Sequence, residues 1–261
     1  MLGNLLARSL YGKSLTRSVG ALRVPTMSAG SKLSQVKFYS KFENQPRLRL
    51  GSTAPNFQAD TTSGKLDFHN YIGDNWVLFF SHPADFTPVC TTELGAFASL
   101  QPEFNKRGVK LIGLSTDGVE SHNKWIKDIE DVTSCGSKVG YPVIDDASKE
   151  VSFLYDMVTE EDFGKISSGP VSTVRSVFII DPLKKVRLIM TYPASTGRNT
   201  AEILRVIDAL QLSDSKGVVT PVDWTTGADV IIPPPVSNEA AKEKFGDFKT
   251  LKPYLRTTKI N

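Results

Sequence analysis

The sequence predicts an α/β fold in which a mixed central sheet is covered by helices on both faces. Short apolar runs rich in β-branched and aromatic residues alternate with segments of helical periodicity, which is typical of strands joined by crossover helices. Towards the end of this pattern two apolar runs flank a short polar turn, which indicates an antiparallel hairpin. With 261 residues, of which 40% are hydrophobic, the chain can bury the core of one large domain, or of one domain with an appendage.

Each expected element follows from a local pattern. Two short runs around the turn at residues 62–65 predict a hairpin, continuous apolar runs predict buried strands, and apolar residues three or four apart predict helices. Because Pro102 interrupts one helical face, we expect the helix that begins at Thr91 to restart there and to end near Gly108. The expected elements in chain order are a hairpin over 56–70, a strand over 77–81, that helix, a strand over 109–115, a helix over 120–129, a short strand over 141–144, a short helix over 148–155, a hairpin of strands 175–180 and 186–192, and a final helix from Thr200.

The order of these elements matches a thioredoxin-like core, which we expect to span residues 46–212. Residues 213–261 differ in character, because prolines such as Pro221 and the run at 233–235 break regular structure. Apolar side chains persist in this part, Trp224 among them, so it is expected to pack against something rather than to move freely. We therefore expect an extended C-terminal arm or a small second lobe.

Residues 1–42 are predicted to be a mitochondrial presequence rather than part of the fold. They contain seven Lys or Arg residues and no Asp or Glu, and Leu2, Leu5 and Leu6 lie at helical spacing. The segment Lys37-Phe38-Tyr39-Ser40 resembles a processing site. A disordered basic tail is the alternative. We expect a mitochondrial location, with the matrix as the compartment.

The net charge of +3 originates in this first segment. The whole chain holds 31 basic and 28 acidic residues, so the part after residue 42 has 24 basic residues against all 28 acidic ones. That balance excludes an interpretation as a nucleic-acid-binding protein. No run of 18 apolar residues is present, so no stable insertion into a membrane is expected.

The two cysteines, Cys90 and Cys135, exclude several kinds of site. They are 45 positions apart and neither belongs to a C-x-x-C motif, so the sequence predicts neither a disulfide scaffold nor a zinc site. We expect no cofactor and no metal. In a mitochondrial matrix both thiols should be kept reduced between reactions.

Cys90 lies where an apolar strand ends and a helix begins. Unpaired backbone N–H groups and the positive end of a helix dipole at such a junction favour the reactive thiolate over the thiol. Thr87 can place a hydroxyl beside the sulfur, Pro83 and Pro88 stiffen the loop, and Arg175 could supply a cation. A lone cysteine is more often an inert core residue. The pattern Pro-x-x-x-Thr-x-x-Cys behind a strand reverses that preference.

This pattern resembles the peroxiredoxins, and closely their 1-Cys branch with a long C-terminal arm. With the predicted presequence, the chain is similar to a fungal-type mitochondrial 1-Cys peroxiredoxin. The resemblance covers about residues 46 to 256, and its cysteine-loop motif is highly specific. The matching segments are PRLRL (46–50), APNF (54–57), SHPADFTPVCTTEL (81–94), KLIGLS (110–115), YPASTGRN (192–199) and TPVDW (220–224).

The resemblance implies roles for the residues of the cysteine loop. Cys90 would be the peroxidatic nucleophile, and Pro83, Thr87 and Arg175 would complete the peroxide-binding site. In the implied reaction, the Cys90 thiolate would attack one peroxide oxygen. This step would release water or an alcohol and leave a sulfenic acid on Cys90.

Three further residues match positions that support this site. Glu93 and Arg198 would belong to the network around the arginine, and His82 would lie beside the loop and hydrogen-bond near the sulfur. For Arg198 the alternative is a solvated cation at the start of a helix. For His82 the alternative is a side chain that caps the end of a strand.

The cycle also needs a thiol that returns the sulfenic acid to the reduced state. The two-cysteine branch carries it in a C-terminal Val-Cys-Pro, but no cysteine follows Cys135 here. We interpret Cys135 as a bystander rather than a resolving thiol. The expected reductant is external, either glutathione with a glutaredoxin or thioredoxin, and the resemblance also implies a homodimer with the C-terminal arm packed across the partner.

Three other activities were weighed against peroxide reduction. Dithiol–disulfide exchange requires a C-x-x-C motif, which Cys90-Thr91-Thr92-Glu93 does not provide. The phospholipid hydrolysis of the mammalian-type 1-Cys branch requires a serine, and Asn75 stands in its place beside Trp76, so we expect no lipase activity. A peroxide-sensing redox relay or a chaperone without efficient turnover remains the alternative function.

Overall fold

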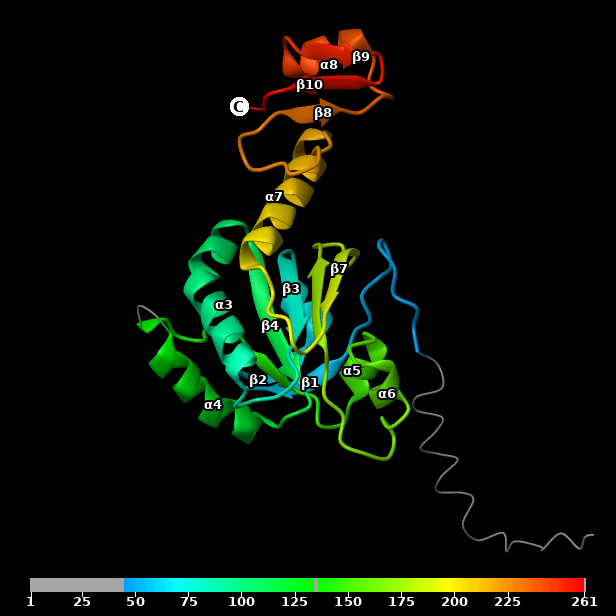
Figure 1. Cartoon of the computed structure of the whole chain (residues 1–261). Coiled ribbons are helices and arrows are strands. Elements are labelled where there is room, and N and C mark those ends of the chain that lie inside the picture. Colours follow the sequence, from blue (N-terminus) through cyan, green and yellow to red (C-terminus); the bar gives the residue numbers. More distant parts are fainter. Residues whose placement is uncertain (1–44, 134–135, 261) are drawn as a thin grey trace, which may run out of the picture.

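The computed structural model describes residues 45–133 and 136–260, which form a seven-stranded mixed sheet, its covering helices and a small second lobe (Figure 1). The predicted presequence over 1–42 and Cys135 lie outside the described residues. The strand order in the large sheet is β2-β1-β5-β4-β3-β6-β7. Its strands are β1 (Gln58–Thr61), β2 (Gly64–Asp67), β3 (Trp76–Ser81), β4 (Val109–Ser115), β5 (Val143–Asp145), β6 (Arg175–Ile180) and β7 (Val186–Tyr192).

The sheet combines parallel and antiparallel pairs. Strand β4 runs parallel to both β3 and β5, whereas β6 is antiparallel to β3 and to β7, with Leu78 opposite Leu111 on one side and Ile179 on the other. The crossovers and hairpins predicted from the sequence are therefore present. A mixed sheet of the thioredoxin-like type is confirmed.

Both faces of the central strands are buried, in two separate cores. Leu78 and Phe80 point into a core that contains Phe97 and Trp125, whereas Phe79 points to the opposite face. The two faces alternate along each strand because successive side chains of a strand point in opposite directions. This explains why the central strands read as continuous apolar runs. The covering helices of the sheet are α2 (Phe68–Ile72), α3 (Pro88–Lys106), α4 (Val119–Val132), α5 (Glu150–Leu154), α6 (Glu160–Phe163) and α7 (Thr200–Lys216).

Helix α3 differs from the expectation in two respects. It begins at Pro88, three residues before the predicted start at Thr91, and it continues through Pro102 without restarting. The early start follows from Pro88 itself, since proline at the first helical position has a favourable φ and loses no hydrogen bond. Pro102 removes a single backbone bond to Ala98, and the packing of buried side chains such as Phe104 on the same helix keeps it continuous.

The C-terminal part is a small lobe with regular structure of its own. Strands β8 (Val230–Ile232), β9 (Lys249–Lys252) and β10 (Leu255–Thr258) form an antiparallel sheet in the order β8-β10-β9, and α8 (Asn238–Phe245) accompanies them. Figure 1 shows this lobe at the far end of α7 from the large sheet. Buried Arg256 holds it together by donating hydrogen bonds to the carbonyls of Pro233 and Val236.

Within residues 45–133 and 136–260, every helix falls short of the length and apolarity that crossing a bilayer requires.

Asp146, next to strand β5, gives a testable pH dependence of stability. Its carboxylate accepts hydrogen bonds from the backbone N–H groups of Val151 and Ser152 at 3.0 and 2.7 Å. Burial nevertheless raises the pKa of Asp146 from 3.8 to about 6, against the effect of these hydrogen bonds. The folded chain therefore binds this proton more tightly than the unfolded chain. The stability that Asp146 contributes is complete below about pH 4 and declines by about 3 kcal/mol as the pH rises through 6.

The variant Asp146→Asn should not show this decline. We expect the free energy of unfolding of the variant, relative to that of the unmodified chain, to increase between pH 4 and pH 7. Denaturant titration at a series of pH values measures this difference. A changed hydrogen bond in the variant shifts its free energy of unfolding by the same amount at every pH. The readout is therefore how the difference between the two proteins changes with pH. Parallel curves for the two proteins would show that Asp146 does not titrate in this range.

Candidate active site

Cys90 is buried in the first turn of α3, directly behind strand β3. The side chain has 0% exposure and packs into the core that also holds Leu94 and Phe97. Thr87 is the N-cap residue, and the first helical backbone bond runs from the N–H of Thr91 to the carbonyl of Thr87. Cys90 therefore lies among the N–H groups that have no partner four residues earlier, at the positive end of the helix dipole. This position favours a negative charge on the sulfur.

Arg175, the first residue of strand β6, reaches across the sheet to this sulfur. Its Nη1 lies 3.2 Å from Sγ of Cys90 and 2.7 Å from Oε2 of Glu93. Its Nε and Nη2 both donate to the carbonyl of Ala194, at 3.2 and 2.8 Å. The guanidinium is only 3% exposed. Because four contacts fix it in the core, the positive charge stays beside the sulfur and does not reorient towards solvent.

Glu93 joins this arginine to a second one. One turn after Cys90 on α3, its Oε1 accepts a hydrogen bond from the backbone N–H of Arg198 at 2.8 Å, and its Oε2 lies 3.5 Å from Nη1 of Arg198. The Arg198 guanidinium also donates to the carbonyl of Ser81 and lies over the ring of Phe80. The alternative of a solvated cation is therefore wrong for Arg198, because its side chain is completely buried.

Burial also changes the pKa of Arg198. It lowers the pKa of the guanidinium to about 10, against the opposing effect of the Glu93 charge, and the neighbouring Arg175 lowers it further. Two arginines and one glutamate thus share a buried compartment with the sulfur. With the thiolate, the two positive charges meet two negative ones.

The loop before the cysteine contains the other predicted residues. Thr87 donates its hydroxyl to the carbonyl of Ala84 at 2.9 Å, which fixes the turn, and Pro83 is half-buried in the same loop. Phe86 has a φ of +54°, a conformation in the left-handed region that non-glycine residues rarely adopt. Phe86 is 55% exposed, and its ring centroid lies 6.4 Å from that of Trp125. The loop is therefore held in a shape that its own residues do not prefer.

His82 lies at the end of strand β3 and forms no hydrogen bond to the sulfur. Its Nε2 is 3.0 Å from Oδ1 of Asp85, and Asp85 also contacts Nδ1 of His122 at 2.8 Å. Burial lowers the pKa of His82, against the effect of Asp85. The sequence analysis missed Asp85 and His122. Asp85 is part of the loop motif, but nothing local marks His122, which is 37 positions away.

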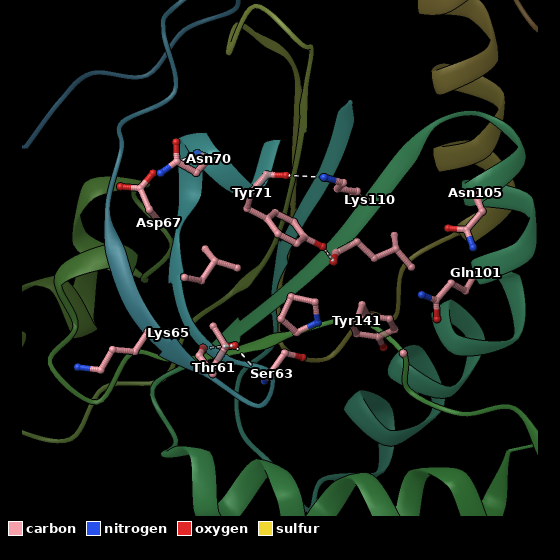
Figure 2. Close-up of a pocket in the computed structure, with 15 residues that line it drawn as sticks. Thr61, Ser63, Lys65, Asp67, Asn70, Tyr71, Gln101, Asn105, Lys110 and Tyr141 are labelled. Carbon is pink, nitrogen blue, oxygen red and sulfur yellow. Dashed lines mark hydrogen bonds between the residues drawn. The ribbon is translucent and has the colours of Figure 1, made fainter. Parts of the chain in front are cut away.

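A cavity of about 550 Å³ elsewhere on the molecule does not belong to this site (Figure 2). It lies beside the C-terminal half of α3, where Gln101 and Asn105 line it, whereas Cys90 is at the N-terminal end. Its two tyrosine hydroxyls are committed to backbone carbonyls, Tyr71 to Leu111 at 2.7 Å and Tyr141 to Leu94 at 2.9 Å. These groups hold the fold together and are not free to act on a substrate.

The geometry brings together a sulfur, a fixed cation and a loop that can position a small ligand. Such a set can stabilise a thiolate and also the negative charge that develops on an oxygen leaving a broken O–O bond. Of the predicted residues, Cys90, Arg175, Glu93 and Arg198 are in one network of direct contacts. Thr87 belongs to the adjoining loop and His82 to a neighbouring cluster.

Comparison with known proteins agrees with this chemistry. The model of the AhpC/TSA family matches residues 50–189, and the model of the C-terminal domain of 1-Cys peroxiredoxin matches residues 209–247. The chain is 63% identical over 219 residues to the mitochondrial peroxiredoxin PRX1 of Saccharomyces cerevisiae, with 84% of each protein covered. It is 48% identical over 221 residues to 1-Cys peroxiredoxin A of Oryza sativa subsp. japonica, covering 82% of this chain and 99% of that protein.

Two solved structures extend the similarity to the fold. A structure of the yeast mitochondrial 1-Cys peroxiredoxin, described as resolving its thiol through glutathione/thioredoxin systems, matches with a TM-score of 0.74 and 58% identity over 82% of this chain and all of that one. A cysteine-to-serine variant of peroxiredoxin 6 from Arenicola marina matches with a TM-score of 0.77 and 46% identity over 82% and 98%. The chain therefore belongs to the AhpC/TSA family and is a 1-Cys peroxiredoxin, a thiol peroxidase.

Proposed function

We propose that Cys90 is the peroxidatic nucleophile of this peroxiredoxin and that Arg175 is the residue that activates it. The observation that carries this assignment is the 3.2 Å contact between the guanidinium and the sulfur, both of which are buried. Glu93 and Arg198 act as positioning residues: Glu93 binds Arg175 without touching the sulfur, and Arg198 in turn contacts Glu93. Pro83 and Thr87 shape the loop against which the peroxide binds.

The reaction runs in three balanced steps. The Cys90 thiolate attacks the nearer peroxide oxygen, the O–O bond breaks, and the leaving oxygen takes a proton to become water or an alcohol. The sulfur is then a sulfenic acid. A first external thiol condenses with it to a mixed disulfide and releases water. A second thiol then attacks that disulfide, which regenerates Cys90 and releases the two external thiols joined as a disulfide.

We further propose that the external thiol comes from glutathione with a glutaredoxin, or from thioredoxin. Support comes from the yeast mitochondrial relative, which is described as using glutathione/thioredoxin systems. The described part of the chain offers Cys90 no cysteine partner. Cys135 is proposed to be a bystander.

Mass spectrometry after one equivalent of hydrogen peroxide tests this assignment. Without glutathione, we expect Cys90 to gain one oxygen. With glutathione, we expect the mass of one glutathionyl group on Cys90. Cys135→Ser should give the same adduct and keep most of the peroxidase activity. A disulfide between Cys90 and Cys135 in the unmodified chain, with a comparable loss of activity in Cys135→Ser, would make Cys135 the resolving thiol.

We propose that the C-terminal lobe forms contacts between the two chains of a homodimer. The C-terminal part carries exposed apolar side chains, with Val222 88% exposed and Tyr254 69% exposed, and the lobe stands away from the large sheet (Figure 1). Exposed apolar side chains of this size are typical of surfaces that a partner covers. Light scattering at micromolar concentration should therefore give twice the mass of one chain. A monomer at that concentration would contradict the proposal.

We also propose that the protein acts in mitochondria, in the matrix, in defence against peroxides. The support is the mitochondrial relative from Saccharomyces cerevisiae and the acid-free basic composition of residues 1–42. Residues 46–212 are proposed as the peroxidase domain and 213–261 as the C-terminal lobe.

A further inference from the structure

A fully buried cluster of two histidines and one aspartate joins the cysteine loop to the neighbouring helix. His82 and Asp85 belong to the loop that leads to Cys90, whereas His122 belongs to α4. His82 and His122 are 0% exposed and the Asp85 side chain is 2% exposed. Ser121 of α4 donates its hydroxyl to the same carboxylate at 2.7 Å. Asp85 thus ties the loop to α4 by hydrogen bonds, beside the contacts of the His82 and Phe86 rings with Trp125 of that helix.

The contacts of His122 determine where its protons lie. Its Nε2 is 3.0 Å from the backbone carbonyl of Ile144 in β5, and a carbonyl can only accept, so Nε2 carries a hydrogen. Its Nδ1 is 2.8 Å from Oδ2 and 3.0 Å from Oδ1 of Asp85. A carboxylate also accepts only. Both nitrogens must then be donors, which describes an imidazolium.

The same reasoning gives the opposite state for His82. Its Nε2 faces Oδ1 of Asp85 at 3.0 Å and donates to it, while its Nδ1 is buried and has no hydrogen-bond partner within the described residues. A bare lone pair on Nδ1 costs less there than an unpaired N–H of a charged ring. His82 is therefore neutral and His122 is charged.

The surrounding charges agree with this assignment. The pKa of His122 is raised, because the hydrogen bond and the charge of Asp85 outweigh the effect of burial, and Asp117 adds to the effect. His82, which follows β3, is neutral and adds no charge opposite His122; the two rings lie 6.1 Å apart. Asp145 of β5 engages the N–H of Val119 at the start of α4. Two acids, Asp117 and Asp145, therefore lie next to α4, whereas the histidine that faces His122 is neutral.

We propose that His122 is a positioning residue for peroxide reduction: its imidazolium bridges Asp85 of the cysteine loop and the Ile144 carbonyl of β5, so that loss of its proton loosens the loop that carries Cys90. A neutral His122 has a single N–H and can keep only one of these two bonds. The proposal extends the peroxidase mechanism but its first test does not depend on turnover.

A metal ion held by the same three side chains is the competing interpretation. One ligand atom of each of the three lies within 4.8 Å of the others. However, the Asp85 oxygens lie only 2.8–3.0 Å from the two histidine nitrogens, closer than the roughly 3.3 Å that separates two ligands of a tetrahedral zinc ion. These are hydrogen-bond distances. They favour protons over an ion between the three groups.

Nitrogen-15 NMR of the histidine side chains provides the first test. The chain has three histidines, so His69→Gln and His122→Gln assign all the signals. At pH 7 we expect protons on both nitrogens of His122 and on Nε2 alone of His82. An unprotonated Nδ1 of His122, either because the ring is neutral or because added zinc occupies the site, would overturn the proposal.

The second test measures the rate at which peroxide oxidises Cys90, as a function of pH. We expect the rate of the unmodified chain to fall about tenfold at alkaline pH, as His122 loses its proton. His122→Gln should be about tenfold slower at pH 7 and should lack this alkaline decline. His69→Gln is the matched control and should keep it, because His69 bonds to Ala54 at 2.7 Å, away from the loop. Identical pH profiles for His122→Gln and the unmodified chain would refute the positioning role.

Discussion

Cys90→Ser is expected to abolish peroxide reduction while leaving the protein folded. A serine hydroxyl is not ionised at neutral pH, so the helix dipole and Arg175 have no thiolate to stabilise. We expect the second-order rate constant with hydrogen peroxide to fall by at least about a thousandfold, to the background of the buffer. Peroxide consumption with glutathione or thioredoxin as donor measures it.

The variant leaves the surrounding network in place, which makes the result specific. Glu93 still pairs with Arg175 at 2.7 Å, and serine occupies less volume than cysteine in the core. Thermal unfolding within a few degrees of the unmodified chain should confirm this. Peroxide consumption that survives in Cys90→Ser would remove this cysteine from the mechanism, and would direct attention to Cys135.

Arg175→Ala is expected to have the second largest effect, on both rate and stability. The variant loses the cation that lies 3.2 Å from the sulfur, and with it the stabilisation of the thiolate and of the leaving oxygen. We expect the rate of Cys90 oxidation to fall by about 10²–10³-fold, as for the loss of one fixed charge or donor in other active sites. The rate of Cys90 oxidation by hydrogen peroxide measures this effect.

The stability effect of Arg175→Ala arises from Glu93. Removing one partner of a buried ion pair costs about 3–5 kcal/mol, because it leaves the other charge in the core. Arg198 remains near Glu93 at 3.5 Å and offsets part of that cost. Arg175→Lys keeps the charge but cannot form the double contact with Ala194, so we expect it to be intermediate in rate.

Arg49→Ala is a matched control, because this arginine is exposed and far along the sequence from the site. It should change neither rate nor stability. If Arg175→Ala kept the pH–rate profile of the unmodified chain, the guanidinium would have no part in activating the thiol.

The sequence predicted those parts of the molecule whose signal is local. Continuous apolar runs identified β3, β4 and β6, because strands buried on both faces cannot alternate in polarity. Helix α3 begins before the predicted start at Thr91 because Pro88 suits the first helical position. The strands β8 to β10 were missed because they are short and, in β9, exposed on both faces.

The residues of the candidate site could be predicted from the sequence, but much of its geometry could not. The loop motif marked Cys90 and Thr87, since their spacing is local. The buried position of Arg198 was not predictable, because its partner Glu93 is 105 positions away and only the folded sheet brings them together. The same holds for His122, whose helix carries a histidine on a buried face without any local sign that an aspartate lies opposite.

The enclosure of the sulfur with Glu93, Arg175 and Arg198 has an electrical consequence for the catalytic cycle. With Cys90 ionised, this compartment is neutral, because two anions face two cations. In the proposed reaction, conversion of the thiolate to an uncharged sulfenic acid leaves one excess positive charge among these buried groups. In the proposed cycle this excess charge would attract an incoming thiolate, and reduction back to the Cys90 thiolate would restore neutrality.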